Sequence, residues 1–265
     1  MHNKNRVGTK QTALITGASS GIGRELAGYF AQDGYNLVLV ARSEIALQDL
    51  ARCLSDKYGI SAAAIPCDLS TLDGITVLLA EISRRNLEID VLVNDAGYGV
   101  ASAVKTIDPQ AQLNMIDLNV RALTELTRAV WPGMLARRRG GLLNVASMAA
   151  LTPSPFMAAY GATKAYVLSF SEALWEEARG SGVRVTCLCP GATDTKFHQR
   201  AGTENMPAGK APRMSARKTA QLGYRAFRAN KRVEIPGLGN KLIARVMSFI
   251  PTGALLKTIG RVYQV

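Results

Sequence analysis

Short, continuously apolar runs alternate along this chain with segments of helical length, and this alternation constrains the fold more than any other feature. The runs lack the polar–apolar alternation of a strand with one wet face, so we expect strands buried on both faces. Expected strands occupy residues 12–16, 36–40, 61–66, 90–94, 142–146, 183–189 and 232–236. Expected helices lie near residues 21–33, 43–58, 71–86, 108–138, 156–180 and 214–230.

Right-handed crossovers between such strands give a doubly wound parallel sheet of the Rossmann type, with a ligand crevice at the carboxyl ends of the strands. We therefore predict an α/β fold with about seven strands in a single domain, residues 1–239. A chain of 265 residues suits one large domain better than two. Residues 195–213 have poor periodicity and several Gly and Pro breaks, so we expect a mobile substrate loop beside the crevice.

Composition argues against several classes of protein. No apolar run reaches about 18 residues, so we expect no membrane-spanning helix. The N-terminal MHNKNRVGTKQ lacks the apolar core of a secretory signal. Because His2 and His198 are the only histidines, we expect neither a zinc site nor a Ser-His-Asp triad. Four cysteines do not indicate a disulfide framework. These features predict a cytoplasmic protein without a metal site.

The net charge of +12 is concentrated near the C-terminus. Residues 206–265 hold 12 Lys or Arg and a single acid, Glu234, whereas residues 1–205 hold 20 basic and 19 acidic side chains. The basic segment has few aromatic side chains on which bases could stack, so nucleic acid is not an expected partner.

Residues 240–265 predict a basic amphipathic C-terminal extension of two short helices on either side of Pro251. The apolar faces hold Leu242, Val246 and Phe249 or Ile250 in the first helix, and Leu255, Leu256, Ile259 and Val262 in the second. In one interpretation these faces pack on the domain or on a partner subunit and cap the substrate pocket. In the other, the extension docks on an anionic membrane surface or on an acidic carrier, which makes the protein peripheral to the membrane.

The first expected strand continues into 16-TGASSGIG-23. Gly17, Gly21 and Gly23 allow a tight turn and a close approach of the backbone to a pyrophosphate, and the helix that follows offers its N-terminal amides to that anion. A glycine loop between a strand and a helix predicts a dinucleotide site. The residues expected to hold it are Gly17, Ser19, Ser20, Gly21, Ile22 and Gly23.

The end of the second strand predicts which dinucleotide binds. A chain that prefers NAD normally has an acid there, which binds the ribose hydroxyls. Here the sequence is 40-VARSE-44, and Arg42 comes first after the strand. A guanidinium suits a 2′-phosphate by its charge and its forked donors, and Ser43 adds a hydroxyl. Glu44 is the competing candidate, but we expect it to belong to the following helix. The predicted cofactor is NADP(H).

Six motifs in order resemble those of the short-chain dehydrogenase/reductase family, over roughly residues 10–240. They are TGASSGIG at 16–23, CDL at 67–69, NDAG at 94–97, LNV at 118–120, Ser147-x12-Tyr160-x3-Lys164, and PGATDT at 190–195. One departure is Asp95, where the family often has a second Asn. The resemblance implies that Asp68 meets the adenine, that Asn94 and Gly97 flank its ribose, and that Thr195 holds the nicotinamide. Further expected cofactor contacts are Leu69, Ala96, Tyr160, Lys164, Pro190, Gly191 and Thr193.

The Ser-Tyr-Lys set indicates general acid–base chemistry. A free phenol has a pKa of about 10, but an ammonium on the same helical face stabilises the phenolate and lowers that pKa. Tyr160 is therefore expected to protonate a carbonyl oxygen in reduction, and Ser147 to hydrogen-bond that oxygen as charge develops. Lys164 also holds the nicotinamide ribose by this resemblance, and Asn119 links Lys164 to solvent through water.

The sequence therefore predicts NADPH-dependent reduction of a small, hydrophobic carbonyl compound, or the reverse oxidation of an alcohol. A β-ketoacyl thioester reductase is the first alternative, because an acidic carrier or CoA would meet the basic tail. A non-catalytic, nucleotide-sensing interaction protein is the second; the intact Ser147, Tyr160 and Lys164 argue against it. The family also implies a homodimer or homotetramer, formed through the helices near 108–138 and 156–180. The pocket is expected between segments 95–104, 148–157 and 195–215.

Overall fold

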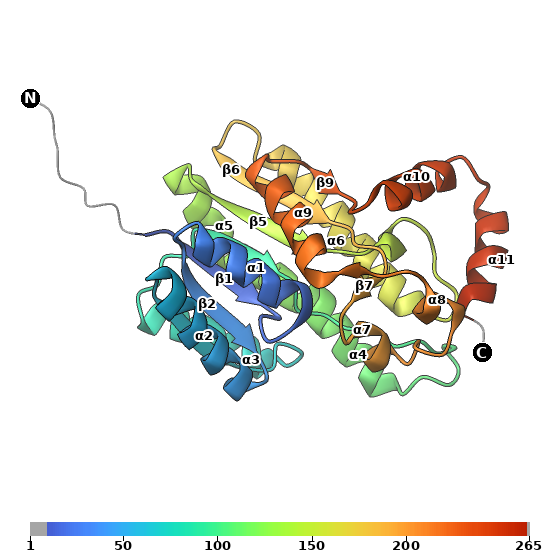
Figure 1. Ribbon diagram of the computed structural model, residues 1–265, viewed down its shortest axis with the longest axis horizontal. Coiled ribbons are helices and arrows are strands. Elements are labelled where there is room, and N and C mark those ends of the chain that lie inside the picture. Colours follow the sequence, from blue (N-terminus) through green and yellow to red (C-terminus); the bar gives the residue numbers. More distant parts are fainter. Residues whose placement is uncertain (1–9, 264–265) are drawn as a thin grey trace, which may run out of the picture.

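The computed structural model describes residues 10–263. The seven strands of its main sheet are all parallel, in the order β3-β2-β1-β4-β5-β6-β9, as expected for a doubly wound sheet (Figure 1). They are β1 (Thr12–Thr16), β2 (Asn36–Ala41), β3 (Ala62–Pro66), β4 (Val91–Asn94), β5 (Gly140–Val145), β6 (Val183–Leu188) and β9 (Val233–Glu234). The segment expected to lack a secretory signal and the last two residues of the extension lie outside the described residues.

Two layers of helices cover the sheet. One face carries α1 (Gly21–Gln32), α2 (Glu44–Tyr58) and α9 (Ala216–Arg228), and the other carries α3 (Leu72–Arg84), α5 (Leu123–Arg137) and α6 (Ala158–Glu177). Within β1, Ala13 and Ile15 pack under the first layer, whereas Leu14 packs under the second. Both sides of each strand are thus buried, which is why the sequence runs are continuously apolar.

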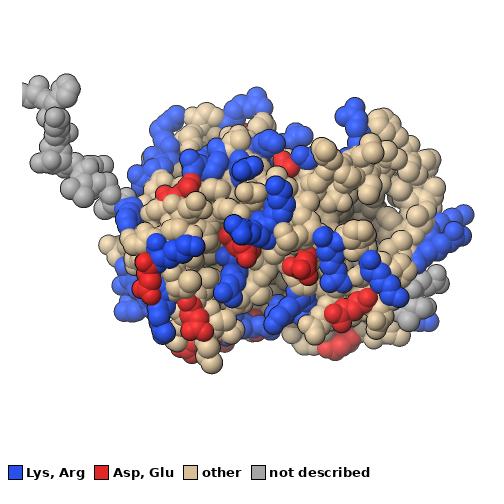
Figure 2. Space-filling view, in the orientation of Figure 1, with Lys and Arg blue, Asp and Glu red and all other residues tan. Residues whose placement is uncertain are grey.

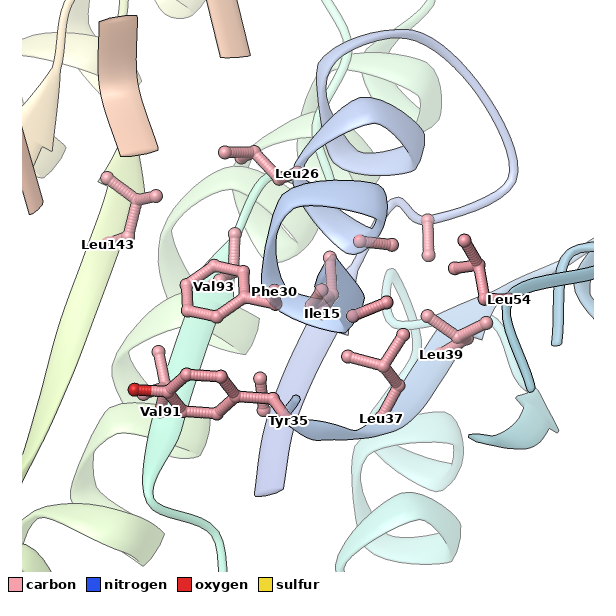
Figure 3. Close-up of a cluster of buried hydrophobic side chains, with 14 of the residues drawn as sticks. Ile15, Leu26, Phe30, Tyr35, Leu37, Leu39, Leu54, Val91, Val93 and Leu143 are labelled. Carbon is pink, nitrogen blue, oxygen red and sulfur yellow. The ribbon is translucent and has the colours of Figure 1, made fainter. Parts of the chain in front are cut away.

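The first of these cores is built around Phe30 of α1 (Figure 3). Its ring meets the ring of Tyr35 edge-on at 5.2 Å between centroids, beside Val91 and Val93 of β4. Aromatic pairs of this geometry add about 0.5–1.5 kcal/mol beyond the burial of their area. This packing fixes α1 on the sheet, and with it the start of α1 at the crevice.

Two predicted elements differ in the structure. The helix expected at 108–138 is α4 (Pro109–Ile116), followed by a π-helical turn (Asp117–Ala122) that continues into α5. The strand expected at 232–236 is shorter, because Pro236 has no amide hydrogen with which to extend the ladder.

The segment 195–213, expected to be a mobile substrate loop, contains two short helices. β7 (Thr193–Asp194) pairs with β8 (Met214–Ser215), and between them lie α7 (Phe197–Ala201) and α8 (Pro207–Lys210). The hydroxyl of Thr195 accepts a hydrogen bond from the backbone amide of Phe197 at 3.2 Å, at the start of α7. Both helices are too short to produce a periodic pattern in the sequence, and the mobility of this segment stays a prediction.

Two helices follow β9 and lie at the end of the molecule away from β3 (Figure 1). They are α10 (Leu238–Met247) and α11 (Thr252–Tyr263), here called the tail helices. Within residues 10–263, no helix is long and apolar enough to cross a bilayer.

Candidate active site

A cavity of about 990 Å³ lies at the carboxyl ends of the strands. It is lined by residues that follow β1, β2, β4 and β5, together with residues of α6, α7 and both tail helices. Nearly all of the residues expected at the cofactor line it; the exceptions are Gly23 and Asn94. Ser147, Tyr160 and Lys164 also line it, whereas Asn119 does not.

The glycine loop forms a cradle that side chains would fill. Gly17 has a φ of +73°, and a Cβ there would lie 2.9 Å from the backbone nitrogen of Ala96. Gly21 also has a positive φ, of +59°. Ser20 precedes α1 in extended conformation, and its side chain makes no capping hydrogen bond. The first two residues of α1, Gly21 and Ile22, line the cavity, so the N-terminal end of the helix dipole faces it, which favours an anion.

Two buried side chains of α6, Tyr160 and Lys164, form the corner of the cavity where catalysis was predicted, here called the catalytic corner. Tyr160 and Lys164 are 7% and 6% exposed, and the Lys164 Nζ lies 5.9 Å from the centroid of the Tyr160 ring. The Lys164 ammonium donates to the backbone oxygen of Val145, at the end of β5, at 2.8 Å. The Tyr160 ring packs against Phe197 of α7, with centroids 5.3 Å apart. Tyr160 and Lys164 are thus held by the sheet and by α7.

Ser147 completes this corner two residues after β5. Its hydroxyl oxygen accepts a hydrogen bond from the backbone amide of Ala149 at 3.1 Å, at the start of a short 3-10 helix (Met148–Ala150). This bond fixes the oxygen and does not use the hydroxyl hydrogen, which remains to be donated to a group in the cavity.

Asp95, the departure from the family motif, lies between the glycine loop and the catalytic lysine. Its carboxylate accepts a hydrogen bond from the Gly23 backbone amide, and a Cβ on Gly23 would come within 2.6 Å of Asp95 Oδ2. Burial raises the pKa of Asp95 to about 7, although the Lys164 ammonium opposes that rise. Burial likewise lowers the pKa of Lys164, and the Asp95 charge opposes it. The sequence did not predict that Asp95 would interact with both Gly23 and Lys164. The acid at a position where the family often has Asn was the feature that could have indicated it.

Asn119 is buried in the π-helical turn between α4 and α5. Its side chain donates to the backbone oxygen of Tyr98 and to the Thr163 hydroxyl, each at 3.0 Å, and accepts from the Tyr98 amide at 3.2 Å. Thr163 in turn donates to the backbone oxygen of Tyr160 at 2.7 Å. These protein contacts make Asn119 a brace for α6, whereas the link to solvent through water remains a prediction.

The opposite end of the cavity is solvent-exposed and charged. Its residues Arg42, Ser43 and Asp68 are here called the rim. The side chain of Arg42 is 71% exposed, and its Nη1 lies 3.9 Å from Asp68 Oδ2. Partial burial raises the pKa of Asp68, but hydrogen bonds from Ser70 and the Arg42 charge outweigh this and lower it overall. Ser43 precedes α2 without making a capping bond, so its hydroxyl is not committed to the helix. Glu44 accepts a hydrogen bond from Gln48 at 2.9 Å and is not among the lining residues.

The side chain of Asn94 is used within the core. It is buried at the end of β4 and donates to Asn144 at 2.9 Å, and Asn144 donates to Ser171 at 2.9 Å. These hydrogen bonds join β4, β5 and α6. Because the side-chain amide is already bonded there, a position of Asn94 beside the adenosine ribose would involve its backbone, and that position stays a prediction.

The substrate end agrees in part with the three expected segments. Each segment contributes to the wall, through residues such as Tyr98, Met157 and Phe197. The tail helices add Ile243, Met247, Ile259 and Val262, of which the sequence analysis had placed only Ile259 and Val262 on an apolar face. The apolar face expected on the first helix instead stays exposed: Leu242 is 64% and Phe249 79% accessible. A second apolar row at positions 243 and 247, four residues apart, was the signal that sequence reasoning missed.

Comparison with known proteins decides the family. Residues 11–205 match the family of short chain dehydrogenases. The chain belongs to this family. It is 38% identical over 178 residues to a very-long-chain 3-oxoacyl-CoA reductase of Laccaria bicolor. That match covers 66% of this chain and 53% of the relative, so the chain spans about half of the relative's length.

Two solved structures of short-chain dehydrogenases resemble the whole fold. One is a short-chain dehydrogenase from Sphingobium yanoikuyae in complex with NADPH, which is 32% identical with a TM-score of 0.80 and covers 91% of this chain and 96% of that one. The other is a bulky-bulky ketone specific alcohol dehydrogenase from Comamonas testosteroni, 31% identical with a TM-score of 0.76, covering 92% and 96%.

Proposed function

We propose that this short-chain dehydrogenase reduces a hydrophobic ketone or aldehyde with NADPH. One observation carries the proposal: a single cavity joins the Ser147, Tyr160 and Lys164 corner to the Arg42 rim on one side and to an apolar wall on the other. The cavity lining runs from the glycine loop to Tyr160 along the strand ends, which suits a dinucleotide with its reactive ring beside Tyr160.

NADPH fits the residues that are present. The glycine cradle and the uncapped start of α1 suit a pyrophosphate, and Arg42 with Ser43 suits a 2′-phosphate. The structural relative from Sphingobium yanoikuyae, which binds NADPH, supports the same choice. Glu44, the one acid that could favour NAD, is turned to Gln48 on α2. When bound, the cofactor supplies the hydride.

The residues of this chain supply the proton and the electrostatic field. Tyr160 donates its phenolic proton to the carbonyl oxygen. The Ser147 hydroxyl hydrogen-bonds to the same oxygen as negative charge develops on it. The Lys164 ammonium stabilises the negative charge that the Tyr160 oxygen carries once its proton is given up, and its bond to the Val145 backbone oxygen holds the ammonium in place. Asp95 favours the charged form of Lys164 in a site where burial opposes it.

A substrate panel tests the proposal. The purified protein is mixed with NADPH and with ketones and aldehydes of increasing size, and the loss of NADPH absorbance is followed. We expect turnover that increases with the hydrophobic size of the substrate and that is much weaker with NADH. NADPH binding without any turnover across the panel would overturn the proposal and favour a nucleotide-sensing protein.

A second candidate, the reduction of a 3-oxoacyl-CoA, has its own support. Lys196 and Arg200 are exposed at the cavity wall, where they could bind the phosphates of CoA. The Laccaria bicolor relative is named for this reaction. The test compares a 3-oxoacyl-CoA with the ethyl ester of the same 3-oxo acid. A preference for the CoA substrate that disappears in a Lys196→Glu, Arg200→Glu double variant would favour this candidate.

A further inference from the structure

A row of large apolar side chains lies exposed on α10 and on the turn that follows it. Leu238, Leu242, Val246 and Phe249, here called the apolar stripe, follow one another at helical spacing and are 86%, 64%, 48% and 79% exposed. Of the twelve large hydrophobic side chains that are exposed in the described part of the chain, six lie between residues 238 and 250. Such a concentration marks an interaction surface, because single exposed apolar side chains are ordinary but contiguous ones are not.

The helix is attached to the domain by its polar residues. Lys241 forms an ion pair with buried Glu234 at 2.9 Å, and Asn240 donates to the backbone oxygen of Pro236 at 2.7 Å. Asn240 also lies against Gly191, at the wall of the cavity. An amphipathic helix normally buries its apolar face against its own domain. Here the polar contacts hold α10 so that the apolar stripe is directed away from the domain.

The charge around the apolar stripe has a single sign. Arg245, Lys257 and Arg261 are exposed on the tail helices, and no Asp or Glu occurs between residues 235 and 263. The nearest acid in sequence, Glu234, is buried and paired with both Lys231 and Lys241. Over α10 and its turn into α11, Figure 2 shows a largely uncharged surface with Lys and Arg at its margins.

We propose that the tail helices rest on an anionic membrane surface, with the apolar stripe inserted at the level of the lipid headgroups. Helices of 10 and 12 residues are too short to span a bilayer, but they suit its interface. Arg245, Lys257 and Arg261 complement anionic headgroups. A second copy of the chain is a poorer occupant, because a two-fold interface on this face would bring the same basic residues of both copies together.

This attachment would place the membrane beside the substrate end of the cavity. Ile243 and Met247 of α10, with Ile259 and Val262 of α11, line the cavity on the inner side of the tail helices. A substrate dissolved in the bilayer could then reach Tyr160 along an apolar wall. This step rests on the proposed function and specifies its substrate as a membrane-partitioned carbonyl compound, whereas the docking itself needs no catalysis.

Vesicle co-sedimentation of the full-length protein tests the docking. We expect binding to phosphatidylcholine vesicles that contain phosphatidylserine at low salt, and loss of that binding at high salt or without the anionic lipid. Leu242→Ser with Phe249→Ser should weaken binding about 100-fold, taking about tenfold for each apolar side chain. Lys257→Glu with Arg261→Glu should weaken it at least about 25-fold, from about fivefold for each lost charge.

Matched variants elsewhere control for general effects. Leu72→Ser with Val77→Ser removes apolar side chains that are 58% and 55% exposed on α3, and Arg52→Glu with Arg128→Glu reverses two exposed charges outside the tail. Both should bind vesicles as the wild type does. Thermal unfolding shows that each variant is folded, and NADPH oxidation with a water-soluble ketone shows that the active site is intact. A failure of that assay in the wild type would count against the proposed function alone.

Three results would overturn the docking proposal. The wild type could stay in the supernatant with anionic vesicles at low salt. The control variants could lose as much binding as the tail variants. Light scattering could show a dimer that the Leu242→Ser, Phe249→Ser variant converts to a monomer, without any vesicle binding, which would assign the apolar stripe to a second copy.

Discussion

The two ends of the cavity differ in how deeply their functional side chains are buried. At the catalytic corner, Tyr160 and Lys164 are almost inaccessible, and the ammonium is bonded to the backbone of β5. At the rim, the Arg42 side chain is 71% exposed, and its Nη1 lies 3.9 Å from the Asp68 carboxylate. The first set is fixed before any ligand arrives, whereas the second is free to adjust to one.

The difference follows from what each end is proposed to do. Proton transfer depends on placing two atoms within hydrogen-bond distance, so the donor must be held by its surroundings. Binding of a phosphate depends mainly on charge and on several interchangeable donors, so a flexible guanidinium in solvent suffices. Substitutions in the corner should therefore alter turnover, and substitutions at the rim should alter only cofactor affinity.

Tyr160→Phe should give the largest effect. It removes the proposed proton donor and keeps the ring that packs on Phe197, so we expect kcat to fall about 10²- to 10⁴-fold with the Kd for NADPH nearly unchanged. Steady-state kinetics and a fluorescence titration of NADPH measure the two quantities. A variant that retains more than a few per cent of turnover would assign the proton donor to another group.

Lys164→Ala should change both kcat and the Kd for NADPH. It therefore tests whether Lys164 both assists Tyr160 and holds the cofactor. We expect kcat to fall about 100-fold, because the Tyr160 phenol loses the positive charge that stabilises its phenolate form. The Kd for NADPH should rise about 10-fold or more, as for other charge-assisted hydrogen bonds. An unchanged Kd would show that Lys164 does not hold the cofactor and acts on the phenol alone.

Arg42→Ala should change affinity without changing chemistry. Loss of a charge-assisted contact with a phosphate costs about 1.5–3 kcal/mol, or roughly 10- to 150-fold in the Kd for NADPH. The Kd for NADH and the kcat at saturating NADPH should stay close to wild type. Arg52→Ala, which removes an exposed arginine of α2, is the matched control. Equal losses of affinity for NADPH and NADH would show that Arg42 does not contact the 2′-phosphate. Glu44 would then be the next residue to test.

The parts that could be predicted from sequence are those that neighbouring residues determine. Strands buried on both faces produce continuous apolar runs, so the prediction of a doubly wound parallel sheet of about seven strands was confirmed. The glycine loop, Arg42 and the Ser147, Tyr160 and Lys164 set could be placed at one crevice because each follows a strand end or shares a helical face. In a parallel sheet, the carboxyl ends of the strands lie on one edge, so sequence position already specifies location.

The remaining features depend on contacts between distant segments. Asn119 is bonded to Thr163, 44 residues away, and no local pattern indicates that pairing. The Asn94 side chain is drawn into the core by Asn144, 50 residues away. Lys241 of α10 forms an ion pair with the buried Glu234, a contact that the apolar periodicity of the helix does not indicate. Sequence patterns give the faces of a helix, but tertiary contacts decide which face is covered.

Asp95→Asn tests the electrostatics of the corner. The folded pKa of Asp95, about 7, lies above the ordinary Asp value of 3.8, so the folded state holds this proton more tightly. The resulting stabilisation is complete below about pH 4 and is lost as the pH rises to about 7. Between pH 5 and 8 the wild type should lose about 2 kcal/mol in free energy of unfolding that Asp95→Asn does not lose.

Urea unfolding at a series of pH values measures this difference, with Asp49→Asn, at an exposed position on α2, as the control. Parallel pH dependences in the wild type and Asp95→Asn would show that the Asp95 carboxyl ionises normally. For the rim we expect that removing a single charge changes the pH dependence of the free energy of unfolding very little, because solvent limits the effect of any one charge there.

Ser43→Ala should give the smallest effect and separates cofactor binding from helix capping. Ser43 stands at the start of α2, but its hydroxyl caps no amide. Loss of a neutral hydrogen bond to the 2′-phosphate should raise the Kd for NADPH about 2- to 10-fold and leave the free energy of unfolding unchanged. Ser215, at the start of α9, does accept a capping bond from the Lys218 amide at 3.2 Å. Ser215→Ala should therefore do the reverse, losing about 1 kcal/mol of stability with no change in NADPH affinity. If both variants lose stability alike, the Ser43 hydroxyl caps α2 after all and is not reserved for the cofactor.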